Sequence, residues 1–333
     1  MQEPSPRFDA AADRPGLAPD DGRGAGAGGL SRSVVVPDFH PDAAALRAVW
    51  DERFKRRREG DPESFVWDYW HVPGQYTYFR TKGDRYFPPD LTAALLARIR
   101  AWGRETLGCR SITNPWLSYY LDGCVQELHA DVPHGPWAYV FSLTDWERRG
   151  FSGGETMMLR DGALDYWRGF DPSAGLGAQD VAELIPSPFN QLAVFDARVP
   201  HGVRQVYGTR DPLDSRIVLH GWFEYPGIET SDDLRGQEAI AALKLVVAYL
   251  GRRLASYDSV TGLLTVRVEL DGSGSVANAR VLSDTLVSTD GAPEAPREVA
   301  RAVLERVREL HVPGAAEGSW ATLPFRLPVA PAP

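Results

Sequence analysis

The sequence is short of cysteine, of long apolar runs and of basic clusters, and each scarcity excludes a class of protein. Cys109 and Cys124 are its two cysteines among 333 residues. So few cysteines exclude a disulfide-stapled scaffold, a zinc finger and a cysteine-held cluster, and they fit a reducing compartment. No stretch approaches the roughly 18 unbroken apolar residues of a membrane-spanning helix. The first residues lack the apolar segment of a secretory signal, so we expect a cytoplasmic protein with no membrane partner.

The charge balance argues against a nucleic-acid partner. The formal net charge is −9 at pH 7, and the one dense basic run covers residues 55–58. That run falls in a predicted helix, where a row of cations is more typical of a solvated face than of a nucleic-acid site. We therefore expect no nucleic-acid partner.

Local patterns predict a mainly β main domain with flanking helices. Apolar residues at helical spacing predict helices over residues 42–54 and 89–107. From about 116 to 225, short apolar runs alternate with Gly, Pro and Asp, which is typical of an all-β domain. A loop-rich insertion at 161–187 interrupts this pattern, and we interpret it as a candidate substrate lid.

The two ends of the chain differ from this central part. Residues 1–33 are rich in Ala, Gly, Pro and Asp, and such a segment cannot bury enough apolar surface to order itself. Near the other end, a strand at 264–270, a turn at Asp271-Gly272, a second strand at 276–281, a helix at 296–310 and a strand at 320–327 predict a small α+β domain of order β-β-α-β. The predicted parts are a disordered tail 1–33, a main domain 34–230, a linking helix 231–255 capped by Ser231, and a small domain 256–333.

Three side chains form a candidate metal site. His129 and Asp131 are two residues apart after an extended stretch, so in a strand they point to the same side. His201 follows 70 residues after Asp131, at the end of another apolar strand. Two histidines and one carboxylate can occupy one face of an octahedral metal, as in non-haem Fe(II) oxygenases. The same ligand types also suit zinc or manganese, so the residues alone leave the metal open.

An arginine next to this site suggests an anionic ligand. Arg216 comes 15 residues after His201, at the start of the apolar strand RIVLHGWF. A buried arginine needs a partner anion, and its planar fork matches a carboxylate. A metal with open positions and a nearby carboxylate clamp would together hold a 2-oxoacid that also has a distal carboxylate.

The arrangement of these motifs resembles the Fe(II)/2-oxoglutarate-dependent dioxygenases, and in particular their prolyl 4-hydroxylase-like branch, over residues 34–226. The matching string is Tyr120-x-x-Gly123, His129-x-Asp131, Gly153-Gly154-Glu155-Thr156, Ala193-x-Phe195, His201-x-Val203, and Arg216 ahead of Gly221-Trp222-Phe223. The resemblance implies a double-stranded β-helix (jelly roll) with supporting helices. It implies His129, Asp131 and His201 as Fe(II) ligands, with Arg216 and Tyr120 on the C5 carboxylate of 2-oxoglutarate. It also implies O2 as co-substrate, ascorbate as a stimulant, and no catalytic residue beyond the metal centre.

Departures from the family pattern limit what carries over. Prolyl hydroxylases usually have a lysine in the place of Arg216, so prolyl specificity does not transfer. Arg210 is a rival for the carboxylate clamp, because the stretch TRDPLDSR is longer than the usual turn. His134, Trp137 and Arg210 are candidate substrate contacts, against solvent contact for His134 and core packing for Trp137. Asp131 argues against the halogenase variant, which leaves that ligand position empty.

The C-terminal pattern resembles a second family. Residues 262–327 are similar to the C-terminal domain of TonB and related proteins, on the basis of the hairpin, the single helix and Leu323-Pro324-Phe325 in the final strand. This resemblance implies a protein partner bound through the small domain.

The resemblances together predict a hydroxylase of an unactivated C–H bond, with a peptide or protein side chain as substrate. A free amino acid or a natural-product intermediate is the alternative substrate. A non-enzymatic jelly-roll binding protein and a zinc or manganese enzyme of cupin type are alternatives of other classes.

Overall fold

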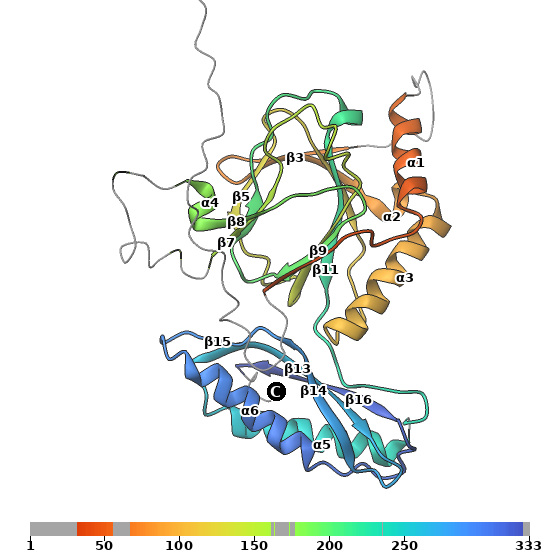
Figure 1. Ribbon diagram of the computed structural model, residues 1–333, viewed down its shortest axis with the longest axis vertical. Helices are drawn as coiled ribbons and strands as arrows, with labels where there is room; N and C mark the ends of the chain where they lie inside the picture. The colour runs from red at the N-terminus through yellow and green to blue at the C-terminus, as the bar shows by residue number, and fades with distance from the viewer. Residues whose placement is uncertain are drawn as a thin grey trace, which may run out of the picture.

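The computed structural model describes residues 32–55, 67–160, 163, 173, 177–234 and 236–328. Within them, helices flank one large antiparallel sheet, and a smaller sheet with two helices of its own lies below it in Figure 1. Most of the predicted tail, of the basic run and of the 161–187 insertion lies outside the described residues. None of the described helices combines the length and the apolarity needed to cross a membrane.

The large sheet curls into a jelly roll. Its described strands follow the order β1-β9-β6-β11-β4-β3-β5-β10-β7-β8, with β2 paired to β3. β3 pairs with β4 through residues 79–82 and with β5 through residues 76–77, so this strand joins the two halves of the roll. The mainly β fold predicted from the sequence is confirmed. The strands are β1 Ser33–Val36, β2 Asp68–Val72, β3 Tyr76–Lys82, β4 Trp116–Tyr120, β5 Val125–His129, β6 Trp137–Ser142, β7 Thr156–Leu159, β8 Ala182–Ile185, β9 Leu192–Asp196, β10 His201–Val203 and β11 Arg216–Phe223.

Two long helices cover one side of the roll. α1 (Ala43–Lys55) buries Leu46 and Trp50, and α3 (Pro89–Thr106) buries Leu95 and Ile99 in the same apolar cluster. The short α2 (Gly83–Tyr86) joins β3 to α3. α3 lies so close to β11 that a Cβ on Gly103 would fall 2.1 Å from the Phe223 ring. This packing holds the outer face of β11 and leaves its other face for the interior of the roll.

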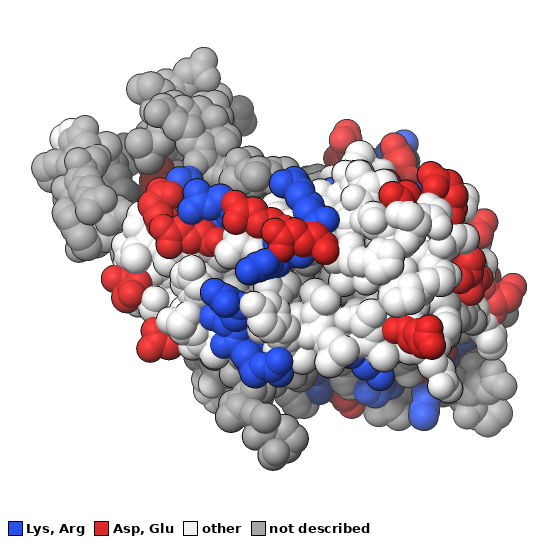
Figure 2. Space-filling view, turned by 90° about the horizontal axis from the view of Figure 1, so that it is seen from below, with Lys and Arg blue, Asp and Glu red and all other residues white. Residues whose placement is uncertain are grey.

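The second sheet has the predicted β-β-α-β order. β13 (Val260–Leu270) and β14 (Val276–Asp284) form a hairpin, and β16 (Trp320–Leu327) pairs with β13 after α6 (Glu294–Arg308). β12 (Glu229–Thr230) pairs with β16, and β15 (Val287–Ser288) with β13. α5 (Gln237–Leu254) contacts β16, and α6 contacts β13 and β14. From below, positive and negative side chains are mixed along one side of the molecule, negative ones predominate on the other side, and uncharged surface lies between them (Figure 2).

Buried polar contacts attach the second sheet to the end of α3. Thr265 and Ser283 both donate side-chain hydrogen bonds to the Leu107 carbonyl, at 2.8 and 3.0 Å. Arg267 is 4% exposed and pairs with Glu105. Because β12 lies inside the range expected for the main domain, the strands do not follow the predicted boundary at residue 230. The division into domains stays a prediction.

Two local predictions were wrong. The helix expected from Ser231 begins at Gln237, because Ser231 instead exchanges hydrogen bonds with the backbone of Trp320. The end of the 161–187 segment is not a loop, because α4 (Ala178–Val181) and β8 occupy it and β8 pairs with β7.

Candidate metal centre

Neighbouring strands bring the three predicted ligands together. His129 ends β5 and His201 begins β10, and the two are direct partners in the antiparallel register. Asp131 lies two residues past β5, where its backbone N–H donates to the Ala197 carbonyl at 2.8 Å. As a result, one ligand atom from each of the three side chains lies within 4.8 Å of the others.

Backbone hydrogen bonds fix which ring nitrogen each histidine turns inward. The Nδ1 atoms of His129 and His201 lie 2.8 and 2.9 Å from the carbonyls of Glu127 and Val199. A carbonyl can only accept, so Nδ1 carries the proton and Nε2 of the neutral ring carries the lone pair. This is the arrangement that orients histidine for metal binding through Nε2.

The inward-facing atoms need a cation among them. Nε2 of His201 lies 3.2 Å from one carboxylate oxygen of Asp131, and Nε2 of His129 lies 3.7 Å from the other. Lone pairs that face each other at these distances repel unless a proton or a metal ion lies between them. A divalent metal satisfies all three groups at once, so the residues fit the ion that the sequence predicts.

The electrostatic surroundings keep His129 and Asp131 unprotonated. Burial lowers the pKa of His129 below its ordinary value. Burial alone would raise the pKa of Asp131, but the hydrogen bond and charge of His201 and the indole of Trp222 bring it below its ordinary value. Trp222 Nε1 donates to Asp131 at 2.9 Å and so orients the carboxylate. At neutral pH His129 and Asp131 are therefore ready to bind a metal without releasing protons.

Arg216 is a buried cation whose hydrogen bonds are incomplete. It is 1% exposed at the start of β11, and its Nη2 donates to Thr156 Oγ1 at 3.1 Å and to Ser187 Oγ at 3.4 Å. Its Nε and Nη1 atoms are buried without a hydrogen-bond partner. Within the described part of the chain no carboxylate forms an ion pair with it, since Glu155 pairs with Arg204 at 3.5 Å. Burial lowers the pKa of Arg216, as expected for an unneutralised guanidinium.

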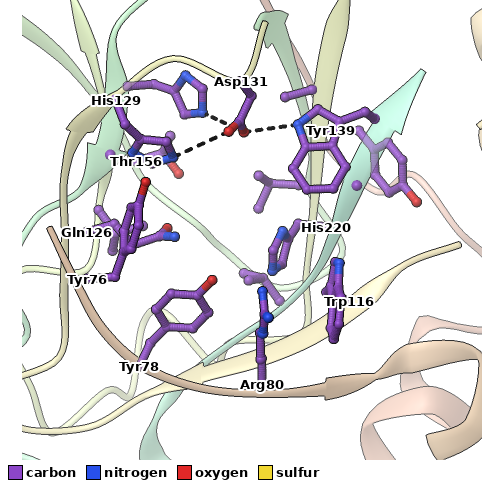
Figure 3. A pocket seen from close by; sticks show the side chains of 18 of the residues that line it. Tyr76, Tyr78, Arg80, Trp116, Gln126, His129, Asp131, Tyr139, Thr156 and His220 are labelled. Carbon is purple, nitrogen blue, oxygen red and sulfur yellow. Dashed lines mark hydrogen bonds and ion pairs between the residues drawn. The ribbon is translucent and has the colours of Figure 1, made fainter. Parts of the chain in front are cut away.

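One cavity connects the metal ligands to Arg216. Its volume is about 200 Å³, and its lining includes all three ligands, Arg216 and the Tyr120 ring, which lies 4.7 Å from the guanidinium carbon. A cavity of roughly 150 Å³ can hold a benzene ring, so this one has room for a small organic acid. Figure 3 shows the side chains that point into it, with Asp131 among its hydrogen-bond and ion-pair partners.

The other predicted site residues lie in different surroundings. Tyr120 is 1% exposed in the cavity wall, and its hydroxyl donates to Gln126 at 3.0 Å. His134 is exposed at the cavity and stacks on Trp222, with ring centroids 4.2 Å apart. Tyr120 and His134 thus both line the cavity, and their contacts with 2-oxoglutarate and with substrate stay predictions.

Trp137 and Arg210 do not reach the cavity, and these two predictions need correction. Trp137 has no exposed surface, because its side of β6 faces the helix-covered core. The Arg210 side chain is 86% exposed and forms an ion pair with Asp122 at 3.6 Å. Neither lines the cavity, so of the two arginines weighed for the clamp, Arg216 is the one that lies in the cavity wall.

Sequence reasoning missed several cavity residues that strand alternation could have found. Every second residue of β11 from Arg216 onward faces the cavity, which adds Val218, His220 and Trp222. His220 is held by Ser118 at 2.8 Å, and burial lowers its pKa to about 3, so it stays neutral. On β3 the same alternation places Arg80 in the lining.

Comparisons with known proteins give structural likenesses without sequence matches. No family model and no curated protein matches this chain. Similar solved structures include a prolyl-4-hydroxylase from Pseudomonas putida, with 18% identity over 58% of this chain and 91% of its own and a TM-score of 0.39. An oxidoreductase of the 2OG-Fe(II) oxygenase family from Burkholderia pseudomallei has 19% identity over 57% and 84%, with a TM-score of 0.37. HygX from Streptomyces hygroscopicus, with nickel, 2-oxoglutarate and hygromycin B bound, has 12% identity over 62% and 90%, with a TM-score of 0.38. At these identities and TM-scores, the function is to be argued from the site residues.

Proposed function

We propose that this chain is an Fe(II)- and 2-oxoglutarate-dependent dioxygenase that hydroxylates an unactivated C–H bond. One observation carries the proposal: a set of inward-facing metal ligands and an unneutralised buried guanidinium line the same small cavity. The ligand set accounts for a metal, and Arg216 accounts for the distal carboxylate of a 2-oxoacid. A zinc or manganese enzyme of cupin type would explain the ligands but would leave Arg216 without a role.

The residues divide the binding work between them. His129, Asp131 and His201 would hold Fe(II) on one face and leave its remaining positions open. Arg216 would receive the C5 carboxylate through the Nε and Nη1 donors that have no partner in the protein. Bound together, Fe(II) and 2-oxoglutarate supply the oxidising chemistry that uses O2. Trp222 holds Asp131 in place, and the aromatic wall around Tyr120 limits the access of water.

The substrate we infer is a peptide or protein side chain. Exposed apolar surface at the cavity supports it, since Trp70, which lines the cavity, is 38% exposed and Val132, next to Asp131, is 49% exposed. Exposed apolar groups close to a binding cavity are typical of a surface that a larger ligand covers. Partner binding through the C-terminal unit, and its similarity to TonB, stay predictions.

The test is succinate formation from 2-oxoglutarate with Fe(II) and O2, with and without a pool of peptides. We expect turnover that peptides stimulate, that His129→Ala abolishes and that His71→Ala preserves. His71 is a matched control, because it is an exposed histidine on β2 that bonds Thr77 away from the cavity. Succinate formation that persists in His129→Ala would contradict the proposal. A preparation that binds zinc or manganese and ignores 2-oxoglutarate would favour the cupin-type alternative.

A further inference from the structure

A second cation, Arg80, faces the interior of the cavity. β3, β4 and β11 are successive strands of the sheet, and Arg80 pairs with Ser118 of β4, which in turn pairs with Val218 of β11. Arg80 therefore lies two strands from Arg216 on the same cavity-lining face. The β3 and β11 backbones are about 10 Å apart at the usual strand spacing, and Arg216 is offset by two residues along β11. In Figure 3, Arg80 and Asp131 point into the cavity from opposite sides.

Two indole rings hold the Arg80 guanidinium in place. Its central carbon lies 3.5 Å from the centroid of the Trp70 ring and 4.1 Å from that of Trp116. Stacking on both faces fixes the plane of a guanidinium and leaves its N–H groups directed outward along the edges. The Nε atom is buried without a hydrogen-bond partner and faces Asp68 at 4.0 Å, outside the cavity, whereas the tip of the guanidinium points into the cavity (Figure 3). The two rings therefore hold a rigid, planar guanidinium that can still donate hydrogen bonds to a ligand.

The charges inside the cavity leave Arg80 without a counter-charge. Of the described residues that line it, Arg80, Asp131 and Arg216 carry permanent charges. In the proposed function, the metal and Arg216 are balanced by Asp131 and the two carboxylates of 2-oxoglutarate. Asp68 lies outside the cavity, is 55% exposed and reaches Arg80 only at 4.0 Å. An ion pair so exposed and so long is worth little and does not neutralise Arg80.

We infer that Arg80, stacked between Trp70 and Trp116, binds a carboxylate of the substrate and so selects acidic over neutral substrates. This inference rests on the proposed function, because it assigns 2-oxoglutarate to Arg216 and leaves Arg80 for the substrate. The carboxylate belongs to an acidic side chain or to a free C-terminus. The carboxylate would lie at the mouth of the cavity, where the Trp70 side chain is 38% exposed.

The test measures binding without turnover. Protein loaded with Mn(II) and 2-oxoglutarate under anaerobic conditions is titrated with paired short peptides, in which Asp is exchanged for Asn, Glu for Gln, or a C-terminal acid for its carboxamide. The readout is the enhanced relaxation of peptide protons by bound Mn(II). We expect acids to bind about tenfold to a hundredfold more tightly than their amides, the range of one charge-assisted hydrogen-bond pair.

Variants separate a binding role from a structural one. Arg80→Gln should abolish the preference for acids, and Arg80→Lys should retain part of it. Lys82→Gln is the matched control and should keep it, because Lys82 lies over the same Trp116 ring at 3.5 Å but outside the cavity. A panel in which no acid is preferred, or a preference that Arg80→Gln leaves unchanged, would overturn the inference.

The binding of 2-oxoglutarate, followed in the same samples, distinguishes the two proposals. If 2-oxoglutarate binds tightly, and its binding depends on Arg216 and not on Arg80, the proposed function stands. The absence of a preference for acidic peptides in those samples would then defeat only the inference about Arg80. Failure of Mn(II) and 2-oxoglutarate to bind defeats the proposed function itself. Loss of 2-oxoglutarate binding in Arg80→Gln but not in Arg216→Met would overturn both assignments.

Discussion

Replacing Arg216 by methionine should change ligand affinity and the stability of the ligand-free fold in opposite directions. Arg216 is 1% exposed, and two of its nitrogen atoms have no hydrogen-bond partner. Methionine fills a similar volume and has no charge to bury. The substitution therefore removes the free-energy penalty of burying an unpaired charge in the ligand-free protein. It also removes the group that would bind the ligand.

The magnitudes follow from the contacts. Each unpartnered buried donor costs about 1–3 kcal/mol, and each of the two bonds from Nη2 contributes roughly 1.5–3 kcal/mol. These contributions nearly cancel, so the desolvated charge decides the sign. We expect Arg216→Met to stabilise the ligand-free protein by about 1–4 kcal/mol. Loss of one partner from a buried ion pair costs about 3–5 kcal/mol, so 2-oxoglutarate should bind about a hundredfold to several thousandfold more weakly.

Two measurements check this pair of effects. The urea midpoint of the metal-free protein reports stability, and calorimetric titration of the Mn(II)-loaded protein reports 2-oxoglutarate affinity. Arg204→Met is the control, because Arg204 is a half-exposed arginine that pairs with Glu155, and both quantities should stay near the wild-type values. A lower urea midpoint combined with unchanged affinity would refute the reasoning, since Arg216 would then be a structural cation.

Three further predictions concern the metal site and the packing behind it. Trp222→Phe removes the indole N–H that orients Asp131, and metal affinity measured against a chelating dye should fall about tenfold to a hundredfold; unchanged affinity would show that Asp131 needs no support. Because the pKa of His129 is lowered, its imidazole in the metal-free protein should stay neutral as pH falls through 6.5, the ordinary histidine value, as an NMR titration of that ring would show; protonation of His129 above pH 6.5 would contradict the assignment. Gly103→Ala improves helix propensity yet drives a methyl group to 2.1 Å from the Phe223 ring, so thermal unfolding should show a loss of about 1–3 kcal/mol, and a gain would mean that α3 can shift away.

The sequence predicted the elements whose side chains alternate or repeat along the chain. The strand starting at Arg216 and the final strand at 320–327 were found because their apolar residues follow the period of a half-buried or buried strand. His129 and Asp131 were singled out because residues two apart in a strand point to the same side, and they meet His201 even though Asp131 lies past the end of β5. Residue patterns were sufficient for these features because the geometry of a single strand decides which way its side chains point.

What the sequence did not predict depends on contacts between distant segments. Ser231 has the residue type of a helix cap, but its hydroxyl oxygen accepts a hydrogen bond from the backbone N–H of Trp320, 89 positions along the chain. Trp137 lies on a cavity strand, but the register with β9 and β11 turns it into the core. Arg80 gains its role only when the fold brings Trp70 and Trp116 to its two faces. Such pairings are set by strand register, which one sequence read alone does not fix.

The most direct test of the account is the visible absorption of the anaerobic protein titrated with Fe(II) and then with 2-oxoglutarate. The account predicts a weak charge-transfer band that requires both additions, persists in His71→Ala, is lost in His129→Ala and needs far more 2-oxoglutarate in Arg216→Met. A protein that binds Fe(II) but forms no band with 2-oxoglutarate, or whose band is indifferent to His129 and Arg216, would contradict it.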